Sequence, residues 1–150
     1  MKKIDTSKKL FDEVNKLQSM HMHDEALLKL EEAEKNGLNT SRLFLMKGLI
    51  FLEKNNFEKA MLNFQEAFRK DSKNVIISNN VGLLHKKILN YSAAIEAFKY
   101  SIELDPANDF AKYHLSVILR EMNKYQEGLE LLYSSTGRIK IGQKIEIFKN

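Results

Sequence analysis

The stretch that decides the fold is YSAAIEAFKYSIELDPAND, which runs from Tyr91 to Asp109. Its small and aromatic residues Ala94, Phe98 and Ser101 recur three or four positions apart, which is the spacing of one face of an α-helix. Pro106 follows this pattern, and a proline cannot continue a helix. The stretch therefore predicts a helix that ends before the proline and packs through small side chains and one large ring.

The same pattern recurs at a fixed period along the chain. Four consecutive segments align without an insertion, each 34 residues long. The segments are residues 7–40, 41–74, 75–108 and 109–142. A period of this length is typical of helical repeat proteins. The equivalents of the three packing residues are Ala26, Leu30 and Ala33, then Ala60, Phe64 and Ala67, then Gly128, Leu132 and Ser135.

Each segment divides into two halves with separate helical patterns. The first half has a small residue at its eighth position in the last three segments, namely Gly48, Gly82 and Ser116. A short polar break such as Asn55-Asn56 follows, and asparagine can end one helix or cap the next. We therefore expect four helical hairpins. The expected first helices span 8–20, 41–54, 75–88 and 109–122, and the expected second helices span 24–36, 58–70, 92–104 and 126–135.

These segments resemble tetratricopeptide repeats. The matching features are the period, the small eighth residue, the alanine at the twentieth position, the aromatic ring at the twenty-fourth, the small twenty-seventh residue and Pro106 at the thirty-second. The resemblance implies an all-α fold, an α-α superhelix in which the hairpins stack as a right-handed solenoid, and a single domain over residues 1–150. Glu13 and Lys47 occupy equivalent positions on neighbouring first helices, and we expect them to pair.

Composition and charge narrow the classes of function. The chain has no cysteine, which excludes thiol catalysis and thiolate metal sites and fits a reducing compartment. The net charge of +4 is concentrated in residues 1–10 and 136–150, so no basic stripe for nucleic acid runs along the repeats. No apolar run approaches the roughly 18 residues of a membrane span. We expect a cytoplasmic protein that binds no nucleic acid and does not insert into membranes.

Candidates for chemistry are few. The segment His21-Met22-His23-Asp24 has ligand-type side chains, but its spacing matches no strong zinc pattern and no second cluster complements it. The chain has no glycine-rich phosphate loop and no nucleophile motif. We therefore expect a protein that is not an enzyme and that needs no cofactor or metal.

The resemblance implies a concave groove, lined by the first helices, that binds an extended peptide or a helix. A two-carboxylate clamp for the acidic C-terminal tails of chaperones needs lysine, asparagine and arginine at set positions, and only the asparagines are present. We therefore expect such tails not to bind. The residues expected in the groove are Asn15, Arg42, Leu45, Met46, Leu49, Asn79, Asn80, Leu83, Phe110, Tyr113, His114 and Val117.

The tail from Thr136 to Asn150 reads TGRIKIGQKIEIFKN. Its isoleucines alternate with polar residues around Gly142-Gln143, which favours a β-hairpin, although three apolar residues also fall on one face of a helix. Such a tail either covers the fourth segment or pairs with another copy or a partner.

The leading prediction is an adaptor that binds a peptide or helix of a partner protein without catalysis. The chain length and apolar groove also fit a small chaperone of a secreted or assembly client. An isoleucine-rich tail also fits a scaffold that self-assembles into a homo-oligomer.

Overall fold

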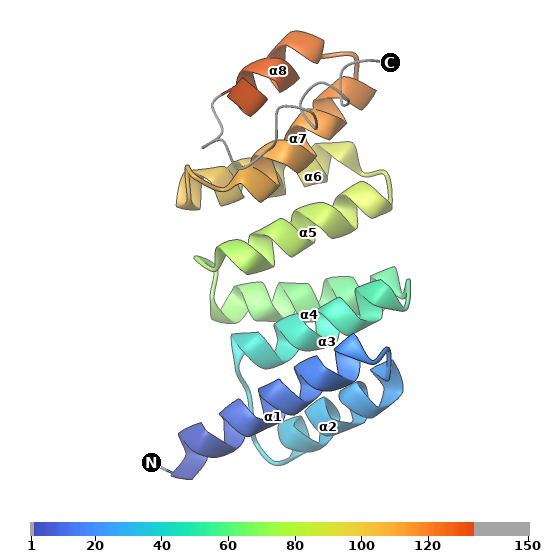
Figure 1. Cartoon of the computed structure of the whole chain (residues 1–150), viewed down its shortest axis with the longest axis vertical. Helices are drawn as coiled ribbons and strands as arrows, with labels where there is room; N and C mark the ends of the chain where they lie inside the picture. The colour runs from blue at the N-terminus through green and yellow to red at the C-terminus, as the bar shows by residue number, and fades with distance from the viewer. Residues whose placement is uncertain (1, 134–150) are drawn as a thin grey trace. The chain divides into compact units, whose positions relative to one another are not determined.

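The computed structural model describes residues 2–133, with side chains from Ser7 onward. This part of the chain is all α-helix, as predicted, and forms eight helices (Figure 1). In chain order the helices are α1 (Lys2–Ser19), α2 (His23–Lys35), α3 (Ser41–Glu53), α4 (Phe57–Lys70), α5 (Val75–Lys87), α6 (Tyr91–Leu104), α7 (Asp109–Glu121) and α8 (Tyr125–Tyr133).

The predicted helix boundaries lie within one or two residues of the observed ones, except at the start of α1. This helix begins at Lys2 rather than near residue 8. The 34-residue period predicts which positions pack. It does not predict how far a helix continues before its first packing position. None of the helices in the described part combines the length and apolar character that a membrane crossing requires.

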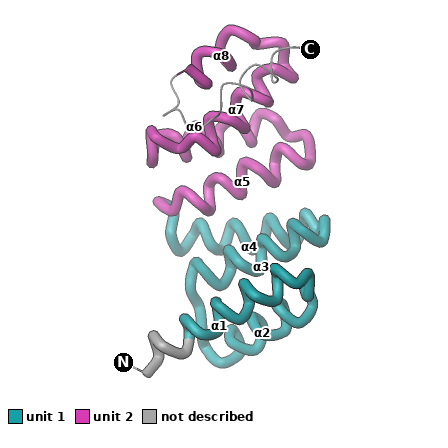
Figure 2. Tube along the Cα trace, in the orientation of Figure 1, with its two compact units in different colours: residues 1–72 teal, residues 73–150 magenta. Residues whose placement is uncertain are grey.

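The chain divides into two compact units, Met1–Ser72 and Lys73–Asn150 (Figure 2). The first unit contains α1 to α4, and α2 packs against both α1 and α3. The second contains α5 to α8, and α7 packs against α5, α6 and α8. The assignment of residues 1–150 to a single domain of four repeats stays a prediction.

The turn inside each hairpin has the same backbone form. One residue of each turn adopts a positive φ, and the next amide donates to a carbonyl five positions earlier, as from Asn56 N to Phe51 O at 2.8 Å. This is the hydrogen bond of a Schellman motif, which ends a helix. The positive-φ residues lie 34 positions apart and are His21 (58°), Asn55 (55°), Leu89 (58°) and Asn123 (59°).

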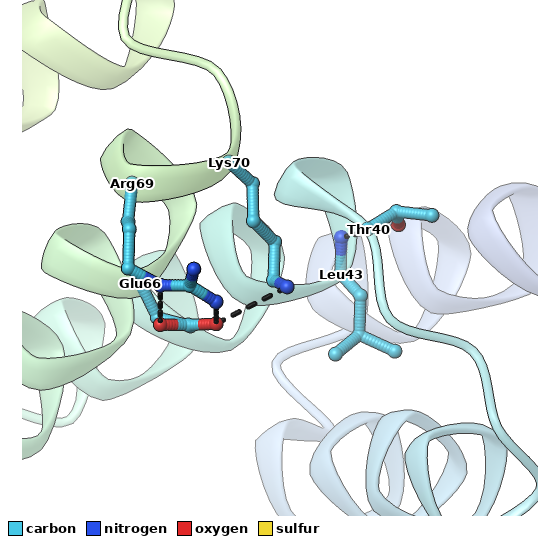
Figure 3. A network of polar contacts seen from close by, with 5 residues as sticks. All are labelled: Thr40, Leu43, Glu66, Arg69 and Lys70. Carbon is cyan, nitrogen blue, oxygen red and sulfur yellow. Dashed lines mark hydrogen bonds and ion pairs between the residues drawn. The ribbon is translucent and has the colours of Figure 1, made fainter.

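Side-chain caps start most of the later helices. Thr40 accepts a hydrogen bond from Leu43 N at 3.3 Å at the start of α3 (Figure 3). Each cap satisfies one of the backbone amides that have no partner within the helix. In the breaks inside the hairpins, Asn56 accepts from Lys59 N at 3.1 Å and Asn90 from Ala93 N at 3.3 Å, which confirms the capping role predicted for asparagine there. The other caps are Asn74 and Asn108.

Small residues bring the two helices of a hairpin close together. In α3, Gly48 lies against the ring of Phe64 in α4, and in α5, Gly82 lies against Phe98 in α6. Both rings are fully buried. The sequence identified these glycines and rings as packing positions but did not predict that each glycine lies against the ring of its own hairpin.

A charged cluster on α4 links this helix to α3. The Glu66 carboxylate accepts hydrogen bonds from Arg69 Nε at 2.9 Å and Nη2 at 2.7 Å, and Lys70 Nζ lies at 3.2 Å (Figure 3). These hydrogen bonds lower the pKa of Glu66 to about 2. Lys70 Nζ also lies 5.3 Å from the centre of the Phe44 ring, so the cluster contacts the aromatic surface of α3.

The predicted pair between Glu13 and Lys47 is wrong. Lys47 Nζ instead lies 2.7 Å from Glu34 Oε2, and Lys29 Nζ lies 2.8 Å from Glu13 Oε1. Both new partners belong to α2, which packs against α1 and α3. The charged side chains of Glu13 in α1 and Lys47 in α3 therefore pair with opposite charges on α2 rather than with each other.

The tail predictions fall on residues 134–150, which lie outside the described residues. The hairpin or helix around Gly142-Gln143 and the association of copies through the tail stay predictions.

Candidate binding surface

The second unit brings seven of the predicted groove residues onto two adjacent helices. Asn79, Asn80 and Leu83 lie on α5, and α7 packs against this helix. Positions three and four apart share one face of a helix. We call these residues, together with Ile76 and Lys86 on α5, the α5–α7 surface. The residues that α7 contributes to it are Phe110, Tyr113, His114 and Val117.

The imidazole of His114 is the centre of an aromatic cluster on this surface. Its ring centre lies 4.4 Å from that of Phe110 and 5.2 Å from that of Tyr113, both in edge-to-face arrangements. It also stacks on the buried ring of Phe98 at 5.6 Å. Phe110 remains 45% exposed, so the cluster runs from the core of the unit to its surface.

A cationic side chain from α5 contacts the same imidazole. Lys86 Nζ lies 3.2 Å from Nδ1 of His114. Burial, helped by the Lys86 charge, lowers the pKa of His114 to about 4. The ring is therefore neutral near pH 7, and Nδ1 can accept a hydrogen bond from the Lys86 ammonium. Sequence reasoning placed His114 in the groove but missed Lys86 as its partner.

Several of the predicted groove residues also have roles inside the unit. Asn79 and Asn108 exchange side-chain hydrogen bonds of 3.0 and 3.5 Å, which ties α5 to the cap of α7. Leu83 packs against the core around Phe98, and Tyr113 and Val117 pack against Leu132 of α8. These contacts hold the surface in place without covering it, because all of these groove residues remain partly exposed.

The predicted groove residues of the first unit lie on α1 and α3 and differ in exposure. Asn15 and Arg42 are exposed, and the Arg42 guanidinium lies 4.4 Å from the centre of the Phe11 ring. Leu49 is partly exposed, whereas Leu45 and Met46 are buried. Whether any of these residues contacts a ligand stays a prediction.

Two other features of the first unit bear on the candidate sites. His23 Nδ1 lies 3.3 Å from Glu53 Oε2, but no three His, Asp or Glu side chains within the described range gather where they could hold a metal ion. A pocket of about 410 Å³ lies between α1 and α2. No sequence signal predicted this pocket. Its lining residues are Ser7, Leu10, Lys29, Glu32, Ala33, Asn36, Gly37 and Leu38.

Comparison with known proteins identifies the repeats and the fold. The tetratricopeptide-repeat model matches residues 41–74 and 77–108. Superkiller protein 3 of Schizosaccharomyces pombe is 28% identical over 85 residues, which are 57% of this chain but only 6% of that protein. The chain thus spans a small part of this curated relative.

Solved structures share the arrangement of helices. The crystal structure of MamA has a TM-score of 0.78 and 12% identity, and the match covers 95% of this chain and 81% of that one. The structure of YrrB, described as a TPR protein with an unusual peptide-binding site, has a TM-score of 0.71 and 20% identity, covering 94% of this chain and 68% of that one. At these identities the likeness concerns the fold alone. Residues 41–74 and 77–108 are thus tetratricopeptide repeats, and the described part of the chain has the fold of tetratricopeptide-repeat proteins.

Proposed function

We propose that the protein is a non-catalytic adaptor that binds a peptide or helix of a partner protein on its first helices. In the second unit this site is the α5–α7 surface. The observation that carries the proposal is the exposure of large apolar side chains at the equivalent second positions of these helices, 58% for Ile76 and 45% for Phe110. Exposed apolar groups rimmed by polar ones are typical of a protein interaction site.

The polar groups beside these side chains suit a polypeptide ligand. Asn80 Nδ2 donates to Ile76 O at 2.7 Å, which orients the carboxamide and directs its acceptor oxygen away from that bond. No described residue occupies this oxygen with a hydrogen bond that would compete with a ligand. A backbone N–H of a bound peptide is the donor that such an oxygen fits. The peptide-binding site of the structurally similar YrrB supports the same use of the fold.

Selection from a displayed library of random peptides against the full chain tests this proposal. We expect selected peptides to bind with affinities measurable by fluorescence anisotropy. Phe110→Ala or Asn80→Ala should each weaken binding roughly tenfold, because truncating a central contact has effects of this order. Leu62→Ala is the matched control, since Leu62 is an exposed apolar residue on the second helix α4.

Two results would contradict the proposal. The first is a selection that yields no binding peptide. The second is a set of peptides that bind the Phe110 and Asn80 variants as tightly as the unchanged chain, because the ligand would then lie elsewhere.

A further inference from the structure

We infer that the α5–α7 surface selects a peptide with one acidic side chain beside a large apolar side chain, the carboxylate binding Lys86 and the apolar group contacting Phe110. The inference rests on the proposed function and specifies the chemistry of the ligand at that same site. The carboxylate that binds Lys86 belongs to an acidic side chain within the peptide rather than to the peptide C-terminus.

Lys86 differs from the lysines that form ion pairs in the structure. Lys29, Lys47 and Lys70 each lie within 3.2 Å of a carboxylate oxygen. Lys86 is partly buried, yet no carboxylate among the described residues lies within ion-pair distance of its Nζ. The nearby Glu121 instead binds Arg120 at 2.6 Å. The ammonium therefore lacks a direct counter-charge among the described residues of the unit.

The neighbour that Lys86 does contact leaves its charge uncancelled. His114 accepts one hydrogen bond through Nδ1, and its ring is neutral near pH 7. An ammonium has three hydrogens, so two remain for a ligand. Partial burial disfavours the charged form and lowers the pKa of Lys86. A ligand carboxylate would offset this cost, because buried charges are stabilised by pairing.

The apolar part of the site, the ring of Phe110, packs against the same His114 imidazole. Phe110 packs edge-to-face on His114 at 4.4 Å, while Lys86 Nζ contacts the Nδ1 atom of that ring at 3.2 Å. A cation and an exposed phenyl ring are thus held by one shared neighbour. This arrangement is complementary to an acidic residue and an apolar residue that lie close together in a peptide.

The number of charges argues against an acidic C-terminal residue as the ligand. Such a residue presents two carboxylates, whereas Lys86 offers one ammonium that lacks a direct counter-charge among the described residues. The charge also argues against the tail of this chain as the occupant, because residues 136–150 carry four basic residues and one acidic residue.

The experiment uses the full chain and two sets of acetylated, amidated peptides, identical except for Glu in one set and Gln in the other. Each peptide contains one Leu or Phe at a varied distance from this position. We expect the best Glu peptide to bind at least about tenfold more tightly than its Gln counterpart, since hydrogen bonds to charged groups have effects of this size.

Variants of the chain assign the effect to Lys86. Lys86→Met keeps the apolar stem and should remove the preference for Glu, leaving Gln peptides unaffected within about twofold. Lys87→Met is the matched control, because Lys87 is the exposed next residue of the same helix, and it should keep the preference. Circular dichroism checks that both variants remain helical.

The outcomes separate the inference from the proposed function. Peptides that bind with equal affinity whether they contain Glu or Gln overturn the inference and leave peptide binding intact. A Glu preference that survives Lys86→Met also overturns it. Binding only by peptides with a free C-terminal carboxylate and no acidic side chain also overturns the inference, because the bound carboxylate would then be the peptide C-terminus. The absence of binding by every peptide contradicts both the inference and the proposed function.

Discussion

A Cβ atom added to Gly48 would lie 2.5 Å from Cε1 of Phe64, closer than side-chain atoms pack in folded proteins. Phe64 is fully buried, so its ring has little room to withdraw. The close approach of α3 and α4 therefore depends on the absence of a side chain at residue 48. Gly82 and Phe98 have the same relationship in the second unit, where the corresponding distance is 2.7 Å.

Gly48→Ala should lower the free energy of unfolding by about 1–3 kcal/mol, the usual cost of overpacking a core. The clash opposes the higher helix propensity of alanine, which is worth roughly 0.5–1 kcal/mol. Urea unfolding measures the change. Adding Phe64→Leu should recover part of the loss relative to the sum of the single variants. Stability equal to or above that of the unchanged chain would show that the helices separate easily.

Lys47 and Glu34 should be energetically coupled, and Lys47 and Glu13 should not. The Lys47 side chain is only 12% exposed and lies 2.7 Å from Glu34. Double-mutant cycles with Lys47→Met, Glu34→Gln and Glu13→Gln measure both couplings by urea unfolding. We expect about 0.5–1 kcal/mol for the Glu34 cycle and a value near zero for the Glu13 cycle. The reverse order would contradict the observed pairing.

Leu89→Gly should stabilise the protein by about 1 kcal/mol. Leu89 has a φ of 58° and is 72% exposed, so it carries the strain of a left-handed backbone without burying its side chain. That strain costs about 1–2 kcal/mol for a residue with a Cβ, and glycine avoids it. Ile88→Gly is the control, because its φ is −90° and the change there should destabilise the helix end. Lower thermal stability of Leu89→Gly would refute the prediction.

The stability of the second unit should fall as the pH drops from about 6.5 to about 4. The pKa of His114 is about 4 in the folded chain, below its ordinary value of 6.5. The unfolded state therefore binds more protons in this interval, so stability rises with pH there. Urea unfolding of the unchanged chain and of His114→Gln isolates this contribution, which the variant should lose. A His114 titration by NMR with a midpoint near 6.5 would contradict the prediction.

The low pKa of His114 also predicts how peptide affinity depends on pH. Since His114 stays neutral well below pH 6.5, its protonation should not change peptide affinity between pH 6 and pH 8. Affinity of a Glu peptide measured across this interval checks the expectation. A midpoint near pH 6.5 that disappears in His114→Gln would show that the imidazole titrates in the site.

The sequence by itself determined the helices, their order and which positions of each helix pack. The period identified Gly48, Gly82, Phe64 and Phe98 as packing positions, but it did not show that each glycine lies against the ring of its own hairpin. The asparagine caps in the breaks followed from local chemistry. The left-handed conformation of Leu89 could be inferred only by alignment with Asn55 and Asn123, since leucine itself does not favour it.

Only the tertiary structure decided which charged groups meet between hairpins and which groove residues stay accessible. Lys47 binds Glu34 rather than Glu13 because α2 packs between the first helices and supplies the nearer carboxylate. Likewise, contact between Lys86 and His114 depends on how α5 packs against α7. A repeat pattern specifies which face of each helix is buried. Which groups a long side chain can reach on a neighbouring helix depends on the spacing and rotation of the packed helices.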